Sequence, residues 1–233
     1  LGYISPDPAD GERHPAILWL GGGDTNSLGD FWTAGPDEND QSARAFREAG
    51  VVMAFVALRG GNGHRSQREF FLGEVDDVLA AARQLAQIRY VDPDRIYLGG
   101  HSTGGTLALL AAAMGKNFRG VFAFGPVASV AHYPRDLVPV DFDRLAPDEL
   151  KLRSPIHWLA GIGQPTWIIE GAQTPGNIGE LDTLCAATRN PQVLCVRVPR
   201  RDHFSVLRPA TLAIAAQIAA GSEIQLTPEG LAR

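Results

Sequence analysis

The chain has 233 residues, of which 45% are hydrophobic and 20% are charged, and its formal net charge is −5. A chain of this length and apolar content can bury one large core, so we expect a single domain spanning residues 1–233. The negative charge balance and the lack of a Lys/Arg cluster argue against a nucleic-acid partner. The longest apolar run, residues 107–114, is too short to cross a bilayer, so we expect a soluble protein with no membrane partner.

The two cysteines and the first residue narrow the class further. Cys185 and Cys195 are too few for a disulfide scaffold, and no Cys/His spacing matches a structural zinc site. We therefore expect two buried, small apolar residues and no metal. The chain starts at Leu1 rather than Met, which suggests a processed product or a fragment, so the compartment stays open with the cytoplasm slightly favoured. The sequence also leaves the oligomeric state open.

Short apolar runs bounded by Gly, Pro and Asp alternate with helical patterns, which is typical of βαβ units. The expected strands are residues 16–20, 51–55, 95–98, 121–124, 166–169 and 193–198. The expected helices are residues 41–49, 74–88, 103–114 and 211–220, with a further helix after the fifth strand. This pattern predicts an α/β protein with a mostly parallel sheet that is covered by helices.

Residues 128–164 are rich in Pro, Asp and Arg and offer only short helices. We interpret them as an insertion over the carboxyl edge of the sheet, where ligands bind in open parallel sheets. Trp32 and Trp158 also fall in loop regions and are candidates for the walls of a substrate site.

The sequence Gly100-His101-Ser102-Thr103-Gly104 lies between an expected strand and an apolar helix. A nucleophile elbow needs small residues two positions on either side of its serine, because the sharp strand-to-helix turn presses them against neighbouring backbone. The turn also leaves Ser102 at the amino end of a helix, where N–H groups favour developing negative charge. The motif alone occurs in ordinary glycine-rich loops, but this context favours Ser102 as a nucleophile.

One histidine follows the last expected strand and precedes the last expected helix. This residue is His203, and the order of serine first and histidine last differs from that of chymotrypsin and subtilisin. We expect His203 to be the general base. The others are expected to be surface or satisfied core residues: His14, His64, His101, His132 and His157.

A glycine-rich loop, Leu20-Gly21-Gly22-Gly23-Asp24, follows the first expected strand. Glycines let the backbone approach a ligand closely, so we expect the N–H of Gly22 to face the oxygen of a substrate. The second donor of this oxyanion hole is expected to be the N–H of Thr103. A phosphate-binding loop is the alternative, but the Lys and Ser/Thr of such a loop are missing, so no cofactor is expected.

The chain resembles the prolyl oligopeptidase-like branch of the α/β-hydrolases, peptidase family S9. The segments that carry the resemblance are Ala49-Gly50-Val51-Val52, Arg59-Gly60-Gly61-Asn62-Gly63, Gly73-Glu74-Val75-Asp76-Asp77-Val78, Val91-Asp92-Pro93-Asp94-Arg95-Ile96, the elbow with its flanking glycines, and Asp202-His203-Phe204. It covers about residues 15–209. The resemblance implies the α/β-hydrolase fold and a serine hydrolase acting on a small ester or peptide, as a catalytic domain without the β-propeller of the large peptidases.

The resemblance fails at the catalytic acid. In the family this acid usually lies three residues after a glycine that ends the penultimate strand, and counting from Gly171 reaches Thr174. Threonine cannot stabilise an imidazolium as a carboxylate does. The missing acid motivates an alternative, a catalytically impaired hydrolase that acts as a binding or regulatory module. An acyltransferase using the same serine is a third possibility.

Several carboxylates can replace the missing acid. Glu170 ends a strand at the carboxyl edge of the sheet, whereas Glu180 and Asp182 lie on the following helix. Asp202 is next to His203 in the sequence, but adjacent side chains in a loop seldom meet in the required geometry. We prefer Glu170 because of its position and length, although a Glu that pairs with an arginine is an almost equal alternative.

Three charged residues have structural interpretations. Asp76 and Asp77 lie in the first turn of an expected helix, where carboxylates are stabilising, so we assign them no chemistry. Arg59 follows a strand and is expected to form an ion pair beside the active-site loops, with a clamp for a substrate carboxylate as the alternative.

Overall fold

The computed structural model describes residues 2–24, 26, 32–134 and 146–232. Within these residues, seven strands form one sheet in the order β1-β3-β2-β4-β5-β6-β7. Their bounds are Tyr3–Ile4 for β1, His14–Leu20 for β2, Val52–Phe55 for β3, Val91–His101 for β4, Gly120–Phe124 for β5, Thr166–Gly171 for β6 and Val193–Val198 for β7. All neighbouring strands are parallel except β1, which runs antiparallel to β3. The predicted mostly parallel sheet is confirmed.

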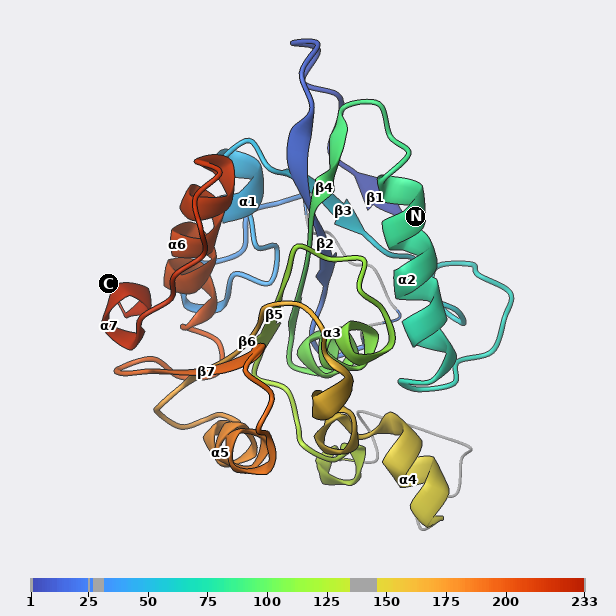
Figure 1. The fold of residues 1–233 in the computed structure, drawn as a ribbon, viewed down its shortest axis with the longest axis vertical. Helices are drawn as coiled ribbons and strands as arrows, with labels where there is room; N and C mark the ends of the chain where they lie inside the picture. Colours follow the sequence, from blue (N-terminus) through green and yellow to red (C-terminus); the bar gives the residue numbers. More distant parts are fainter. Residues whose placement is uncertain (1, 25, 27–31, 135–145, 233) are drawn as a thin grey trace.

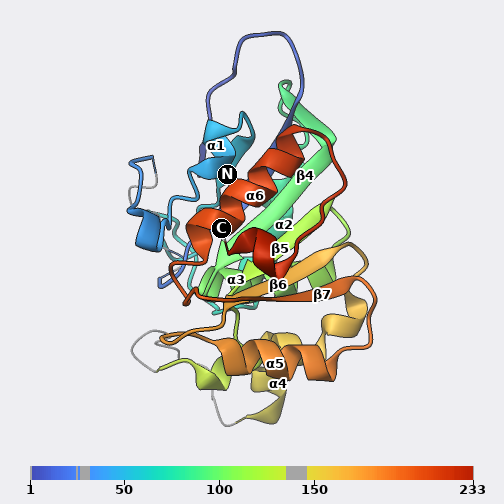
Figure 2. The ribbon, with the colours of Figure 1, turned by 90° about the vertical axis from the view of Figure 1, so that its left-hand side faces the viewer.

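Helices cover both faces of the sheet. They are α1 (Ala45–Glu48), α2 (Gly73–Leu85), α3 (Thr103–Met114), α4 (Pro147–Arg153), α5 (Ile178–Ala187), α6 (Leu207–Ala219) and α7 (Pro228–Leu231). Helices α1 and α6 lie on one side of the sheet and α2 and α3 on the other (Figure 1). Figure 2, turned by 90°, looks onto the side that α6 covers. Among the described helices, none is long and apolar enough to cross a membrane.

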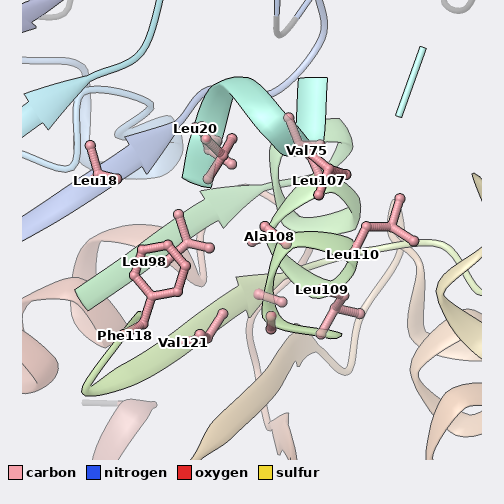
Figure 3. Packing of buried hydrophobic residues seen from close by; sticks show 14 of the residues in the cluster. Leu18, Leu20, Val75, Leu98, Leu107, Ala108, Leu109, Leu110, Phe118 and Val121 are labelled. Carbon is pink, nitrogen blue, oxygen red and sulfur yellow. The ribbon is translucent and has the colours of Figure 1, made fainter. Parts of the chain in front are cut away.

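The central strands are buried on both faces, which explains their nearly continuous apolar sequences. On β2, Ile17 and Trp19 pack in the cluster beneath α1 and α6, whereas Leu18 and Leu20 pack in the cluster beneath α2 and α3. Side chains alternate in this way because successive residues of a strand point to opposite faces. Figure 3 shows the second cluster, in which the side chains of β2, β4 and β5 meet those of α3. The strand ends that carry the site therefore emerge from a core packed on both sides.

Helix α1 is shorter than the expected helix over residues 41–49. Ala43 has a φ of 45°, in the left-handed region that an α-helix cannot include, so the regular helix begins only at Ala45. The hydroxyl of Ser42 also bonds to the carboxylate of Asp40, at 2.5 Å. Such local bonds between short polar side chains compete with helix formation.

Only part of the segment that we expected to lie over the active site, residues 128–164, is described by the structure, and its last part follows another course. Residues 135–145 lie outside the described residues. Residues 155–164 run back along α3, where the Gln164 side chain donates a hydrogen bond to the carbonyl of Ala112 at 2.9 Å. Because β5 ends at the carboxyl edge and β6 begins at the opposite edge, this part of the segment is a crossover connection rather than a cover for the site.

Trp158 lines a cavity, but not at the end of α3 that carries Ser102. The cavity has a volume of about 340 Å³, and its wall includes Leu110 and Met114 from the C-terminal half of α3. The second loop tryptophan, Trp32, is 38% exposed and has the guanidinium of Arg47 5.0 Å above its ring. Trp158 is therefore separated from the elbow by most of the length of α3.

The prediction that the cysteines are buried apolar residues was wrong. Cys185 of α5 and Cys195 of β7 form a disulfide, with Cα atoms 6.2 Å apart. Helix α5 packs against β7, the edge strand of the sheet, so two residues ten positions apart meet through tertiary packing. A count of cysteines cannot reveal this contact, because it depends on where the helix lies relative to the strand.

Candidate active site

Ser102 occupies the sharp turn between β4 and α3. Its φ is 55° and its ψ is −114°, a backbone conformation that non-glycine residues rarely adopt. A Cβ atom on Gly100 would lie 2.4 Å from the carbonyl oxygen of Gly104, and one on Gly104 would lie 2.2 Å from that of Leu20. The Ser102 N–H donates to the carbonyl of Phe124 at 2.7 Å. The elbow therefore has the close backbone contacts that its glycines predicted.

The glycine-rich loop after β2 lies beside the first turn of α3. The Thr103 hydroxyl donates a hydrogen bond to the carbonyl of Gly23 at 2.8 Å. A Cβ atom on Gly22 would lie 2.8 Å from Nδ1 of His101, so the loop has no room for a side chain there. The two expected oxyanion donors, Gly22 and Thr103, thus belong to segments that contact each other next to Ser102.

His203 and Glu170 meet in a buried contact. Nδ1 of His203 lies 3.0 Å from Oε2 of Glu170, and the Glu170 side chain is fully buried. The other carboxylate oxygen accepts the N–H of Gly171 at 3.0 Å, and the His203 N–H donates to the carbonyl of Pro175 at 3.0 Å. A carboxylate only accepts hydrogen bonds, so Nδ1 carries the proton and Nε2 is left as the proton acceptor.

The end of β5 lies against both the Ser102 backbone and this pair. Gly125 follows Phe124, whose carbonyl binds the Ser102 N–H, and its φ is 55°. A Cβ atom on Gly125 would lie 2.4 Å from both Oε2 of Glu170 and Cε1 of His203. The three expected catalytic side chains therefore come from strand ends and turns that surround one glycine. Gly125 was not among the residues expected in the site, although a glycine directly after a buried strand was a usable signal.

The two helix carboxylates have other partners. Oε2 of Glu180 accepts the N–H of Ala128 at 2.7 Å, and its Oε1 lies 2.8 Å from Nδ1 of His132. Asp182 pairs with Arg197 on the neighbouring strand, at 2.5 Å. Both carboxylates are thus used in contacts with residues other than His203.

Asp202 and Thr174 do not serve as the partner of His203 either, because Asp202 binds backbone N–H groups and Thr174 is exposed. Oδ1 of Asp202 accepts the N–H of Ser205 at 2.8 Å and that of Phe204 at 3.0 Å. The backbone hydrogen bond from Ser205 lowers the pKa of Asp202, as expected for a carboxylate that binds amide groups. Thr174, at the family's usual acid position, is exposed. Of the carboxylates considered, Glu170 is the one that contacts the His203 ring.

His101, set aside in the sequence analysis as a satisfied or surface residue, is buried within the site. Its Nε2 lies 3.0 Å from the carbonyl oxygen of His203, and the centroids of the two rings are 4.4 Å apart. Its Nδ1 lies 2.9 Å from Nε2 of Gln41. Burial, with a smaller contribution from His203, lowers the pKa of His101 to about 3. The signal that could have found it is its position directly before Ser102, at the end of a buried strand.

Arg59 has the structural contacts expected of it. Its guanidinium binds both carboxylate oxygens of Asp77, at 2.9 Å each, and Oε1 of Glu69 at 2.7 Å. Burial opposes the ionised form of Asp77, but the hydrogen bonds from Arg59 outweigh it and lower the pKa of this carboxyl. Asp76, in the same helical turn, is exposed. With three of its nitrogens engaged in this way, Arg59 is held by the protein rather than available as a clamp.

Comparisons with known proteins show which sequences the chain is similar to. The model of the prolyl oligopeptidase family matches residues 38–149. Among curated proteins, prolyl endopeptidase FAP from Mus musculus is 35% identical over 91 residues, which represent 36% of this chain and 12% of the relative. The match therefore covers only about an eighth of the length of this relative.

Solved structures share the fold over nearly the whole chain. A puromycin-hydrolyzing peptidase from Mycobacterium tuberculosis has a TM-score of 0.71 at 18% identity, covering 97% of this chain and 38% of its own. Dipeptidyl peptidase 4 from Porphyromonas gingivalis has a TM-score of 0.69 at 20% identity, covering 94% and 33%. An esterase from Pyrobaculum calidifontis has a TM-score of 0.62 at 22% identity, covering 92% and 79%. These similarities show the α/β-hydrolase fold.

Proposed function

The chain carries a prolyl oligopeptidase-like α/β-hydrolase domain of peptidase family S9, and from this premise we propose that it is a serine hydrolase that cleaves ester or peptide bonds. The family match and the hydrolases among the similar structures support hydrolase activity in general. The catalytic roles that we propose rest on one observation, the 3.0 Å contact between Nδ1 of His203 and Oε2 of Glu170 beside the elbow of Ser102. Ser102 is the nucleophile, His203 the general base and Glu170 the acid.

The acylation step follows from these roles. Nε2 of His203 accepts the hydroxyl proton of Ser102 as Oγ attacks the carbonyl carbon of the substrate. The Glu170 carboxylate holds the Nδ1–H tautomer and stabilises the imidazolium that forms. The N–H groups of Gly22 and Thr103 bind the oxyanion of the tetrahedral intermediate. When this intermediate collapses, the departing alcohol or amine takes the proton from His203, and an acyl-enzyme remains on Ser102.

The deacylation step uses the same groups. Water gives a proton to Nε2 of His203 and attacks the acyl carbonyl, and the oxyanion donors again bind the developing charge. Collapse returns the proton to Oγ of Ser102 and releases the carboxylic acid. The alternative of an impaired, regulatory hydrolase rested on the missing acid at Thr174. The contact of Glu170 with His203 supports the active serine hydrolase over this alternative.

A fluorophosphonate probe tests the proposal, because it labels an activated serine rapidly. We expect the wild-type chain to be labelled and to hydrolyse short p-nitrophenyl esters. Ser102→Ala should keep the fold and lose both properties, since no acyl-enzyme can form. Ser222→Ala, which changes an exposed serine outside the site, should behave as wild type. Labelling of the Ser102→Ala variant at the wild-type rate would refute the serine mechanism.

A further inference from the structure

We propose that His101 is a positioning residue for the general base, because the N–H of its imidazole holds the backbone of His203 in place beside the nucleophile. This inference rests on the serine mechanism proposed above. His101 is the last residue of β4 and the neighbour of Ser102, and it is 1% exposed. Its ring thus connects the elbow directly with the segment that carries the base.

The hydrogen bonds of the ring define its tautomer. Nε2 of His101 lies 3.0 Å from the carbonyl oxygen of His203, and a carbonyl oxygen can only accept a hydrogen bond. Nε2 therefore carries the proton. In the neutral ring Nδ1 is then an acceptor, and the side-chain amide of Gln41 lies 2.9 Å from it.

Asn39 fixes the orientation of the Gln41 amide. Nε2 of Gln41 lies 2.7 Å from Oδ1 of Asn39, so one of its two hydrogens is donated there and the other is available to Nδ1 of His101. The chain of contacts runs from Asn39 through Gln41 and His101 to the carbonyl of His203. Oε1 of the same Gln41 amide lies 3.1 Å from Nδ1 of His101, so the tautomer is set by the other side of the ring, where Nε2 faces the carbonyl oxygen of His203.

The neutral state of His101 suits its place beside the base. During catalysis the His203 ring becomes an imidazolium 4.4 Å from the His101 ring, and a second positive charge there would oppose it. Around the ring, among the described residues, the titratable group is His203, and the uncharged Gln41, Gly22 and Phe204 are its other neighbours. Burial keeps the pKa of His101 near 3, so the ring stays neutral while the base gains and loses its proton.

The same ring also supports the oxyanion loop. Gly22 is so close that a Cβ atom there would lie 2.8 Å from Nδ1 of His101. Nucleophile, base and oxyanion loop therefore each contact or adjoin His101. Small displacements of catalytic groups reduce rates strongly, so loss of the Nε2 hydrogen bond should cost on the order of 10²-fold in kcat.

Two substitutions separate the hydrogen bond from the packing of the ring. His101→Phe keeps an aromatic ring but removes the donor, whereas His101→Gln retains an N–H near the position of Nε2. We expect kcat for a short ester, and the rate of fluorophosphonate labelling, to fall about 10²-fold in His101→Phe, and we expect His101→Gln to recover most of the loss. His157→Gln, a change of an exposed histidine, is the matched control. Normal kcat in His101→Phe, or equal losses in both variants, would overturn the proposal.

Gln41→Leu provides a test if His101→Phe does not fold. It leaves the His101 ring and its Nε2 contact with the His203 carbonyl in place and removes the polar partner of Nδ1, so we expect a smaller loss of kcat with the proton still on Nε2. Unchanged kcat would contradict the role of the contact chain.

Nitrogen-15 NMR of the imidazole rings tests the tautomer without reference to activity. We expect His101 to show one protonated and one unprotonated nitrogen from about pH 8 to about pH 5, the range in which histidines usually titrate. A second proton on His101 within this range would overturn the proposal. If the wild-type chain is not labelled by the fluorophosphonate, the serine mechanism fails while this measurement still reports on His101. If labelling succeeds and the His101 variants behave as wild type, only the positioning role fails.

Discussion

The proposed nucleophile, Ser102, and the proposed acid, Glu170, are held by two very different backbone structures. The elbow around Ser102 is constrained at almost every position, because Gly100 and Gly104 press against backbone atoms and the serine itself has a left-handed φ. Glu170 instead lies in regular backbone at the end of β6, with its Cα paired in register with Arg197 of β7. The elbow depends on local backbone sterics, whereas the acid depends only on a carboxylate within reach of the imidazole.

This difference explains why one part of the family pattern is retained and another is not. A side chain at Gly104 has no alternative place to go, so the elbow tolerates few sequences. A carboxylate can reach Nδ1 of His203 from more than one backbone position, so a long Glu at the strand end can take the place of an acid three residues beyond Gly171. The two regions should therefore respond differently to substitution.

The largest expected effect is that of Gly104→Ala in the elbow. The new Cβ atom would lie 2.2 Å from the carbonyl oxygen of Leu20, a backbone atom that cannot move independently. We expect a loss of stability on the order of 3 kcal/mol or more, measured by denaturant unfolding, together with loss of ester hydrolysis.

Gly179→Ala in α5 is the matched control for this substitution. An added Cβ atom there meets no atom within 4 Å, so the same change should be neutral or stabilise the helix by about 1 kcal/mol. Equal stability of the two variants would contradict the steric account of the elbow.

Glu170→Gln should have the next largest effect. We expect the fold to persist and kcat to fall by about 10⁴-fold, the typical loss when a triad loses its carboxylate. Glu180→Gln and Asp182→Asn remove the same charge at positions that contact other residues, and both should retain nearly normal kcat. If one of these two variants loses activity while Glu170→Gln does not, our assignment of the acid is wrong.

Removal of the disulfide tests whether the acid depends on the edge of the sheet. Replacing Cys185 and Cys195 together by serine frees α5 from β7, the strand that pairs with the strand of Glu170. For a cross-link between residues ten positions apart, we expect a loss of about 2–3 kcal/mol in the free energy of unfolding. We expect kcat to be nearly unchanged, because β6 is also paired with β5. A large loss of kcat would show that Glu170 is held by the edge of the sheet.

A smaller effect should appear in the pH dependence of stability. Folding lowers the pKa of His101 from its ordinary value of 6.5 to about 3, so below pH 6.5 the unfolded chain takes up a proton that the folded chain does not. Stability is therefore lost as the pH falls, by about 2 kcal/mol at pH 5 from this residue alone. Denaturant unfolding of the wild type and of His101→Gln, each at pH 5 and at a pH above 6.5, measures this loss of stability. The variant should lose less stability at pH 5 than the wild type does. Equal losses in the two proteins would contradict the assignment of this pH dependence to His101.

The sequence predicts those parts of the fold that depend on local patterns. The expected strand 193–198 and helix 103–114 agree with the observed bounds of β7 and α3, because apolar runs with clear ends define them. The expected helix 41–49 was too long because the left-handed Ala43 is not visible in hydrophobic periodicity. The course of residues 155–164 along α3 depends on long-range packing, which composition does not reveal. For this reason the segment was expected to cover the site.

The same distinction applies to the site. Ser102 and His203 were predicted because their motif and chain order are specific, and the tests above concern their roles. Glu170 was one of several candidates, because its contact with His203, 33 residues away in the sequence, depends on the folded chain. His101 was set aside because its contact with the His203 carbonyl joins residues 102 positions apart. No local pattern predicts such a contact.

The cysteine bridge has a practical consequence for work with this protein. Thiol reductants and reducing cell interiors keep cysteines unpaired, whereas oxidising media let disulfides form and persist. Cys195 is exposed and Cys185 is only partly buried, so the bridge is accessible to dissolved thiols. Two preparations of the same chain, made with and without reductant, are therefore chemically different samples. The thiol content of each should be titrated before their melting temperatures are compared.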